Sequence, residues 1–401
     1  MKKMTKLTAR INSIKPSPTL AITMKANALR AEGRDIIGFG AGEPDFDTPD
    51  NVKRAAIRAI DEGFTKYTPV GGIDELKDAI IGKLQRDSQL SYSRAQIAVS
   101  CGAKHTLYNL AQVLFEEGDE VIIPSPYWVS YPDIVVLTGA KPVILKTKAS
   151  EGFKIQPAQL EAAIGARTRA VIINSPSNPS GVAYTAAELE KLADVMARKK
   201  VLVISDDIYE KILYDDMSFV NVPAICPAMK DLTVVVNGLS KSHAMTGWRI
   251  GYAAGPAEII AAVTKLQSQN TSNPNSIAQK ASVEALNGDQ SVVTSMVREF
   301  EKRRNVIVEK LNAISGITCM IPQGAFYVFP SIAGLQGRKY GGKVLTTSAD
   351  WAAYLLDEAN VAVIPGGEFG HDDHIRLSYA TSMANIEKGL HRIREAVMKL
   401  G

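Results

Sequence analysis

Long apolar runs and long basic runs are both missing from the 401-residue sequence. No stretch of about 18 apolar residues occurs, so we expect no membrane span. The basic start, residues 1–7, lacks the apolar segment of a secretory signal peptide. Lys and Arg number 46 against 42 Asp and Glu, a formal net charge of +4, and no basic block is long enough to grip a nucleic-acid backbone. We therefore expect neither a membrane nor a nucleic acid as partner.

Cysteine is also scarce. Cys101, Cys226 and Cys319 are odd in number and far apart, which favours reduced thiols and a cytoplasmic location. The segment His371–His374 (HDDH) holds potential metal ligands. No further ligand cluster accompanies it, so a polar loop is the preferred interpretation and no metal is expected. Internal repeats, low-complexity tracts and obvious flexible linkers are absent as well.

What the sequence does contain is a globular composition with alternating strands and helices. Apolar residues make up 46% and charged residues 22%, enough for a large core and, at this length, for two domains. Short apolar runs rich in β-branched residues occupy 97–100, 120–123, 170–173, 201–204 and 233–236. Helical patterns at 104–117 and 188–199 separate several of them. This alternation predicts an α/β fold with a parallel sheet covered by helices on both faces, and ligands beyond the carboxyl ends of its strands.

The flanking regions have a different pattern. Residues 256–313 are predicted to form long helices with a break at 271–275, and residues 316–379 to mix short strands with loops before a final helix at 385–400. We expect a large domain at residues 46–296. A smaller α+β domain is expected to combine the N-terminal segment 1–45 with residues 297–401.

Residues 237–252 carry the most informative pattern. The run 233–236 ends at the turn pair Asn237-Gly238, and Lys241 follows among small and hydroxyl residues. A strand-end lysine held away from water favours the neutral amine, which attacks aldehydes. The nearby phosphate-binding candidates are Ser240, Ser242, Thr246 and Arg249. Lysine, phosphate site and glycine turn together suggest pyridoxal 5′-phosphate (PLP); the alternative is a solvated surface lysine after a turn.

Polar residues after other strands fit the same cofactor. Asp206 ends an apolar strand, where a carboxylate needs a cation or a shifted pKa, and a protonated pyridine nitrogen meets that need. Tyr209 and Asn178 are placed to hydrogen-bond a ring hydroxyl, and Gly102–Lys104 opens a helix whose N–H groups suit a phosphate. Trp128 suits stacking on a ring. The ordinary alternatives are a capping aspartate, a common glycine before a helix and a core tryptophan.

Two further segments have patterns that occur in ligand-binding sites. Gly40–Gly42 resembles the start of a dinucleotide fingerprint, but Asp45 stands where the third glycine belongs and Pro44 breaks a continuing helix, which disfavours a Rossmann dehydrogenase. Near the C-terminus, Arg376 and Ser378 share one face of an apolar strand. An arginine there suits a bidentate carboxylate clamp, with a solvated edge strand as the alternative.

Taken in order, these motifs resemble a known family over almost the whole chain. The matching segments are Ala41–Phe46 (AGEPDF), Lys66–Thr68 (KYT), Ser125–Tyr131 (SPYWVSY), Asn178–Gly181 (NPSG), Ser205–Tyr209 (SDDIY), Ser240-Lys241 and Arg376–Tyr379 (RLSY). The chain is similar to the class I, fold type I PLP-dependent aminotransferases, and among them to the bacterial gamma-subgroup aspartate aminotransferases. The resemblance implies a mixed, mostly parallel sheet sandwiched by helices, plus a smaller α+β domain.

The resemblance also implies a role for each matched position. Lys241 would hold PLP as a Schiff base and then move the proton between the substrate α-carbon and C4′ of the cofactor. The other implied cofactor ligands are Asp206 at the pyridine nitrogen, Asn178 and Tyr209 at the phenolic oxygen, Trp128 on the ring, and Ala103, Lys104, Ser240 and Arg249 at the phosphate. Tyr67 would reach the phosphate of the partner subunit, which implies a homodimer. The implied substrate ligands are Gly42, Trp128, Asn178 and Arg376.

Substrate preference depends on departures from the pattern. Gly238 stands where many relatives have serine or threonine, and the alpha-subgroup arginine for the distal carboxylate has no match around 269–272. In the gamma subgroup a lysine and a threonine, here Lys104 and Thr19, recognise that carboxylate, and Lys15 matches a position linked to prephenate use. The alternative is that Lys15 and Lys104 are ordinary surface lysines.

The resemblance therefore implies transamination of L-aspartate with 2-oxoglutarate, with prephenate as a second acceptor, by a cytoplasmic homodimer acting on amino acids and 2-oxo acids. The alternatives within the fold are an aminotransferase for aromatic amino acids, alanine or kynurenine, and a PLP lyase or synthase. A regulator that uses the fold only to bind a ligand is disfavoured. It needs a helix-turn-helix domain ahead of the fold, and about 15 residues precede it.

Overall fold

The computed structural model describes residues 5–16 and 18–400, except the side chains of 18–20. Its centre is a seven-stranded sheet in the order β2-β8-β7-β6-β5-β3-β4. The strands are β2 (Ile97–Ser100), β3 (Glu120–Ser125), β4 (Lys141–Lys146), β5 (Thr168–Asn174), β6 (Leu202–Asp206), β7 (Thr233–Gly238) and β8 (Gly251–Ala254). Strand β8 pairs antiparallel with both β2 and β7, and every other pair of neighbouring strands in this sheet is parallel. The sheet is thus mixed and mostly parallel, as predicted.

Helices cover both faces of this sheet because successive strand side chains point to opposite sides. In β3, Val121 and Ile123 pack toward α5 (Ala103–Leu114), α6 (Ser130–Val136) and α10 (Ala257–Asn270). The intervening Ile122 packs toward α7 (Pro157–Ala163), α8 (Ala186–Lys199) and α9 (Pro227–Asp231). The β2 end of that second face is covered by α3 (Asp50–Asp61), α4 (Asp74–Ser88) and α11 (Ser276–Asn287).

Local signals explain where two of these helices begin. Thr185 caps α8 by accepting the Glu188 N–H at 3.3 Å, while the Glu188 carboxylate accepts the Thr185 N–H at 2.8 Å, a reciprocal capping box. Gly102 precedes α5 with a φ of +92°, a conformation that costs glycine little. The predicted helix opening at Gly102–Lys104 is confirmed, although α5 ends at Leu114 rather than at 117.

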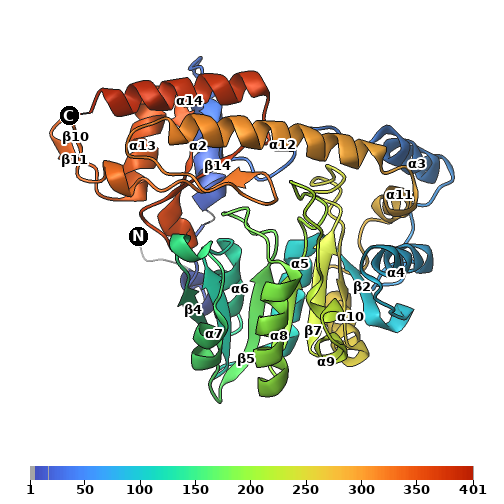
Figure 1. Cartoon of the computed structure of the whole chain (residues 1–401). Helices are drawn as coiled ribbons and strands as arrows, with labels where there is room; N and C mark the ends of the chain where they lie inside the picture. Colours follow the sequence, from blue (N-terminus) through green and yellow to red (C-terminus); the bar gives the residue numbers. More distant parts are fainter. Residues whose placement is uncertain (1–4, 17, 401) are drawn as a thin grey trace.

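A second layer of structure lies above the carboxyl ends of the strands (Figure 1). Its three-stranded sheet has the order β13-β14-β9, formed by Ile364–Pro365, Ile375–Ser378 and Tyr327–Val328. The N-terminal strand β1 (Ile37–Gly38) pairs with β12 (Val361–Ala362). The remaining elements of this layer are α2 (Pro18–Ala31), α12 (Ser291–Asn312), the hairpin β10 (Lys339–Tyr340) and β11 (Lys343–Val344), α13 (Ser348–Ala359) and α14 (Met383–Met398).

The helix α13 corrects the expectation that residues 316–379 hold only short strands and loops. Trp351, Tyr354 and Leu355 recur at the helical spacing and are buried in the same core cluster. Thr347 caps the helix together with Asp350. The helical period was present in the sequence, but the short strands on both sides of α13 obscured it.

The predicted domain boundaries at residues 45/46 and 296/297 stay a prediction. The second boundary falls inside α12, which packs against α14 of the upper layer and extends toward α3 and α11 (Figure 1). The break predicted at 271–275 does separate α10 from α11. Over the part of the chain that the structure describes, no helix has the length and apolar character to cross a membrane.

Candidate active site

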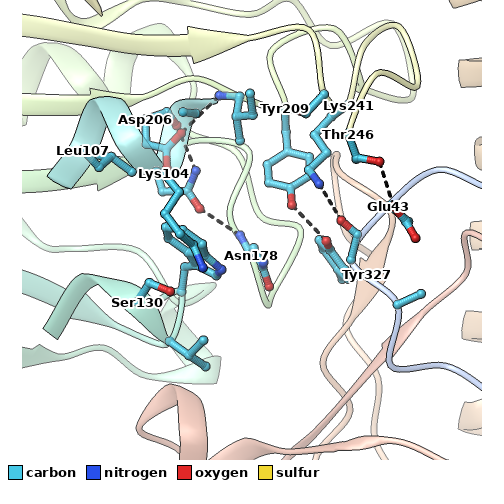
Figure 2. A pocket seen from close by; sticks show the side chains of 18 of the residues that line it. Glu43, Lys104, Leu107, Ser130, Asn178, Asp206, Tyr209, Lys241, Thr246 and Tyr327 are labelled. Carbon is cyan, nitrogen blue, oxygen red and sulfur yellow. Dashed lines mark hydrogen bonds between the residues drawn. The ribbon is translucent and has the colours of Figure 1, made fainter. Parts of the chain in front are cut away.

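A cavity of about 380 Å³ lies where the sheet meets the upper layer. Figure 2 shows its side chains converging from several elements. The lining residues that follow strands of the large sheet include Ala103, Lys104, Trp128, Tyr131, Asn174, Asn178, Asp206, Tyr209, Ser240, Lys241 and Arg249. The others come from the N-terminal segment and the upper sheet, and include Gly40, Gly42, Glu43, Tyr327 and Arg376. Most of the residues singled out in the sequence thus meet in one cavity.

Lys241 follows β7, and its side-chain amine points into the cavity (Figure 2). The amine donates a hydrogen bond to the carbonyl of Gly42. Burial, partly offset by the nearby Glu43 carboxylate, lowers the pKa of Lys241 to about 8. A lysine in this state keeps a substantial fraction of neutral amine near neutral pH, as nucleophilic attack on a carbonyl requires.

Asp206, at the end of β6, is buried beside this amine. Burial raises the pKa of its carboxyl group to about 6, even though the Tyr131 hydroxyl donates to it at 2.6 Å. The Asp206 carbonyl accepts the Asn174 side-chain amide at 2.8 Å, which ties β5 to β6 at this point. A buried carboxylate with a raised pKa is a good partner for a cationic ring nitrogen, because such a cation would compensate its desolvation.

A cradle for an anion lies at the beginning of α5. The first N–H groups of a helix have no partner within the helix, and Ala103 and Lys104 line the cavity there. Arg249 lies against this turn: a Cβ on Gly102 would be 2.5 Å from its Nη2 atom. Its Nη1 atom donates to the Thr246 carbonyl at 2.8 Å. With Ser240 also on the lining, this group has the composition of a phosphate site.

Trp128 and Lys104 form a second feature of the cavity. The Lys104 ammonium lies 4.8 Å from the centre of the Trp128 ring, within cation–π range. Burial, assisted by the charge of Arg249, lowers the pKa of Lys104. The Trp128 ring packs edge-on against Tyr131. Lys104 thus lines the cavity while its side chain stays exposed, and its role stays a prediction.

Arg376 is the most deeply buried cation of the site, with 2% of its surface exposed. Its Nη1 atom donates to the Asn178 side-chain oxygen and its Nη2 atom to the Gly40 carbonyl, both at 2.9 Å. Its buried Nε atom has no hydrogen-bond partner among the described residues. The side chain is thus held in a fixed orientation by two of its five N–H donors while the described residues leave the others unused, which suits recognition of a carboxylate.

Sequence reasoning assigned no role to four residues that the structure places in the site. Tyr131 bonds to Asp206 and Asn174 bonds to the Asp206 backbone. Tyr327 bonds to Tyr209 at 2.9 Å, and the Glu43 carboxylate accepts the Thr246 hydroxyl at 2.7 Å. Tyr131 and Asn174 follow strands of the predicted sheet, which was a usable signal. Glu43 and Tyr327 gave none, because their position depends on packing between distant segments.

Two of the residues for which the resemblance implies a role, Tyr67 and Lys15, do not line the cavity. Tyr67 is 91% exposed. Lys15 is exposed and lies near Asp133, where its charge opposes the burial that raises the pKa of that carboxyl group. The side chain of Thr19 is outside the described residues. Their predicted roles stay predictions.

The HDDH segment forms a compact cluster away from these residues. Ligand atoms of His371, Asp373 and His374 lie within 4.8 Å of one another. His374 bonds to Asp373 at 2.8 Å and stacks on Phe329. The Ser125 hydroxyl oxygen lies 3.3 Å from the Nε2 atom of His371. Protein groups engage both imidazoles, and the expectation that no metal binds here stays a prediction.

The strand-end lysine, the buried aspartate and the anion cradle define a PLP-dependent enzyme, and comparison with known families agrees. The chain belongs to the class I and II aminotransferases, whose family model matches residues 34–393. It is 53% identical over 391 residues to an aspartate aminotransferase of Geobacillus stearothermophilus, covering 97% of this chain and 98% of that protein. It is 51% identical over 391 residues to an aspartate/prephenate aminotransferase of Nitrosomonas europaea, with the same two coverages.

Solved structures agree with this assignment. The aspartate aminotransferase of Rhizobium meliloti has a TM-score of 0.96 at 49% identity, covering 99% of this chain and 100% of that one. That of Thermus thermophilus, solved with maleate, has a TM-score of 0.92 at 41% identity, covering 98% and 100%. The predicted family and fold are therefore confirmed.

The cofactor of this family is PLP, and the donor set of the cavity fits it. Asp206 supplies a desolvated carboxylate for the ring nitrogen, and the start of α5 with Arg249 supplies donors for the phosphate. Lys241 supplies an amine of lowered pKa for the aldehyde. The three groups differ in charge and hydrogen-bonding character, and each matches a different part of PLP.

Proposed function

We propose that this chain transfers the amino group of L-aspartate to 2-oxoglutarate, giving oxaloacetate and L-glutamate. The observation that carries the proposal is the joint presence, in one cavity, of Lys241 and Asp206 with two separate cations, Arg376 and Lys104. Two cations suit a substrate with two carboxylates. Its similarity to aspartate aminotransferases at about half identity supports the same substrate.

Each residue has a proposed role in binding the cofactor. Asp206 binds the pyridine nitrogen, and Asn178 and Tyr209 bind the phenolic oxygen. Trp128 stacks on the ring. The proposed phosphate ligands are Ala103, Lys104, Ser240 and Arg249. When bound, PLP withdraws electrons from the α-carbon of the substrate through its protonated ring.

The chain itself supplies the proton transfer and the orientation. Lys241 would carry the proton between the substrate α-carbon and C4′ of the cofactor, and its lowered pKa makes the neutral base available. Gly42, Asn178 and Arg376 hold the α-carboxylate and so fix which bond faces Lys241. The hydrogen bond from the Lys241 amine to the Gly42 carbonyl supports this placement, because it puts the base beside the carboxylate site.

Lys104 is proposed to bind the distal carboxylate, together with Thr19 and Lys15 of the N-terminal segment. An ammonium group is a point charge with freely rotating donors, so it accepts carboxylates at several distances and angles. This tolerance makes prephenate a proposed second acceptor, as the name of the Nitrosomonas relative suggests.

We also propose that the enzyme is a homodimer in which Tyr67 serves the phosphate of the partner subunit. The support is that Tyr67 is a large, exposed aromatic side chain which does not line the cavity of its own subunit, within the described residues. A cytoplasmic location is proposed from the three cysteines, none of which is paired.

A substrate panel tests the proposal. Aspartate, glutamate, alanine and aromatic amino acids would be assayed as donors against oxaloacetate, 2-oxoglutarate and prephenate. We expect aspartate with 2-oxoglutarate to give the highest kcat/KM. Preference for an aromatic amino acid, alanine or kynurenine would favour another aminotransferase. Product formation without a 2-oxo acid acceptor would favour a lyase or synthase.

A further inference from the structure

Tyr327 lies between Arg376 and Tyr209 in the cavity and contacts both. It belongs to β9, and its residue partner across the upper sheet is Ser378 of β14, the strand that carries Arg376. Its side chain is fully buried and lines the cavity. Figure 2 shows its hydroxyl pointing at Tyr209, which follows β6 in the lower sheet. Tyr327 therefore joins the two layers of the molecule inside the site.

Three contacts define this position. The Tyr327 hydroxyl lies 2.9 Å from the Tyr209 hydroxyl. Its ring centre lies 4.6 Å from the guanidinium carbon of Arg376, a cation–π contact. A Cβ on Gly42 would be 3.3 Å from the same hydroxyl, so the Gly42 backbone packs against it. One side chain thus touches the proposed carboxylate ligands and a proposed cofactor ligand.

The direction of the hydroxyl bond follows from proton counting. Burial raises the pKa of both Tyr209 and Tyr327, so each is a neutral phenol with one proton. If Tyr209 donates its proton to the phenolic oxygen of PLP, its own oxygen must accept from Tyr327. Hydrogen bonds in such a chain polarise one another, so the Tyr327 bond makes Tyr209 a stronger donor.

We propose that Tyr327 is a positioning residue that couples occupation of the carboxylate site at Arg376 to the hydrogen bond that Tyr209 donates to the cofactor. A carboxylate bound at Arg376 offsets the guanidinium charge that the Tyr327 ring contacts, and the Tyr327 hydroxyl bonds to Tyr209. The inference rests on the proposed function, because the roles of Arg376 and Tyr209 belong to it. The charged groups that act on the tyrosine pair are Arg376, Glu43 and Asp206.

The test compares wild type with Tyr327→Phe by pH titration of the visible absorbance of bound PLP. Removing the Tyr327 hydroxyl weakens the hydrogen bond that Tyr209 donates and leaves more negative charge on the phenolic oxygen of PLP. The proton on the nitrogen that joins Lys241 to PLP is then retained to higher pH. We expect the midpoint to rise by about 0.3 to 1 pH unit, the equivalent of one net hydrogen bond. Incorporation of the more acidic 3-fluorotyrosine at position 327 should move the midpoint in the opposite direction.

Coupling is tested with a second variant and with maleate, a dicarboxylate without an amino group. In a Tyr209→Phe background, Tyr327→Phe should cause no further change of the midpoint, because the donor it acts through is gone. Saturating maleate should move the wild-type midpoint, and this displacement should shrink in Tyr327→Phe. An unchanged midpoint, an equal change in the Tyr209→Phe background or an equal maleate effect would each overturn the proposal.

Tyr379→Phe is the matched control. Tyr379 and Tyr214 form another buried hydroxyl pair, 3.2 Å apart, in the same hydrophobic cluster but away from the cavity lining. Its substitution should leave the midpoint unchanged, and an equal rise would mean that Tyr327→Phe acts only through general loosening of the core. Absence of a visible PLP band or of transamination in wild type would refute the proposed function itself, whereas an active wild type with an unaffected Tyr327→Phe variant would refute only the coupling.

Discussion

One wall of the cavity is made by residues that follow strands β2, β3, β5, β6 and β7, and we name it the strand-end wall. The facing wall, named the outer wall, combines Gly40–Glu43 with Tyr327 and Arg376 from three distant parts of the chain. On the strand-end wall, each residue ends or follows a strand that is hydrogen-bonded to its neighbours in one sheet. On the outer wall, the side chains are fixed by contacts between segments, such as Arg376 with the Gly40 carbonyl.

The two walls therefore differ in how their geometry is secured. A parallel sheet places the carboxyl ends of its strands at one edge whatever the loop sequences are. The outer wall has no such template: β1 with β12 and β9 with β14 form separate small sheets. We expect substitutions on the strand-end wall to remove the chemistry. Substitutions on the outer wall should change binding and orientation.

The largest effect is expected for Lys241→Ala, which would break the strand-end wall at the proposed base. Loss of proton transfer alone costs roughly 10²- to 10⁴-fold in kcat, and loss of cofactor attachment adds to it. Borohydride reduction followed by peptide mapping should find PLP on Lys241 in wild type. Lys191→Ala, at an exposed lysine on α8, should leave activity unchanged. PLP recovered on a different lysine would contradict the assignment.

The lowered pKa of Lys241 gives the same prediction a pH dependence. Because burial holds this pKa at about 8, the fraction of neutral amine grows as pH rises toward that value and levels off above it. The rate at which PLP reconstitutes the apoenzyme should follow this fraction. A rate still rising steeply above pH 10 would indicate an amine with the ordinary lysine pKa.

Asp206→Ala should come next. Removing one partner of a buried charge pair costs roughly 2–5 kcal/mol, or about 30- to 4,000-fold. The loss should fall on the half-reaction with aspartate, measured by stopped-flow absorbance, while the PLP affinity set by the phosphate cradle changes less. Tyr131→Phe keeps the carboxylate and removes one hydrogen bond to it, so roughly 1.5–3 kcal/mol is expected. Near-normal turnover in Asp206→Ala would refute the role.

Arg376→Lys tests the outer wall. The charge remains but the planar fork is lost, so we expect a cost near the lower end of the range for a buried charge contact, roughly 2 kcal/mol or about 30-fold in kcat/KM. The loss should be the same for aspartate, glutamate and alanine, because all carry an α-carboxylate. A defect confined to dicarboxylates would place Arg376 at the opposite end of the substrate.

Lys104→Ala should have a smaller and selective effect. A partly exposed ion pair contributes about 1 kcal/mol, equivalent to roughly fivefold in kcat/KM. Aspartate and glutamate should lose this factor while alanine is spared, which would sharpen the comparison by showing a specificity residue on the strand-end wall. Equal losses on all three substrates would leave Lys104 as a phosphate or structural residue.

The smallest signal is expected from mixed subunits. Tyr67→Ala and Lys241→Ala proteins, unfolded together and refolded in equal amounts, should form hybrid dimers with one intact site. Random pairing makes half of the dimers hybrids, so about a quarter of wild-type activity should return. Verified subunit exchange without any recovery would show that Tyr67 does not act across the interface.

Sequence patterns led to residues on both walls: Gly42 and Arg376 of the outer wall were among them, whereas Tyr131 and Asn174 of the strand-end wall were missed. Asp206, Asn178 and Lys241 were found because apolar runs end next to them, and the sheet rule then places them together. Tyr327 was missed because its chain neighbourhood, an apolar stretch near a short strand, is typical of any core. Helix α13 was missed for a related reason: two-residue strands on both sides interrupt the period that would have indicated it.

By itself, the sequence determined the elements, their order and the chemistry at the strand ends, since these depend on hydrophobic periodicity, turn residues and a sheet that aligns them. Tertiary structure alone decided which distant groups meet there. It placed the Gly42 carbonyl on the Lys241 amine and the Tyr327 hydroxyl on Tyr209. Burial in the tertiary structure also lowered the pKa of Lys241 and raised the pKa of Asp206. These outcomes depend on how far each group is removed from water and on what packs against it, and neither quantity is carried by any local stretch of sequence.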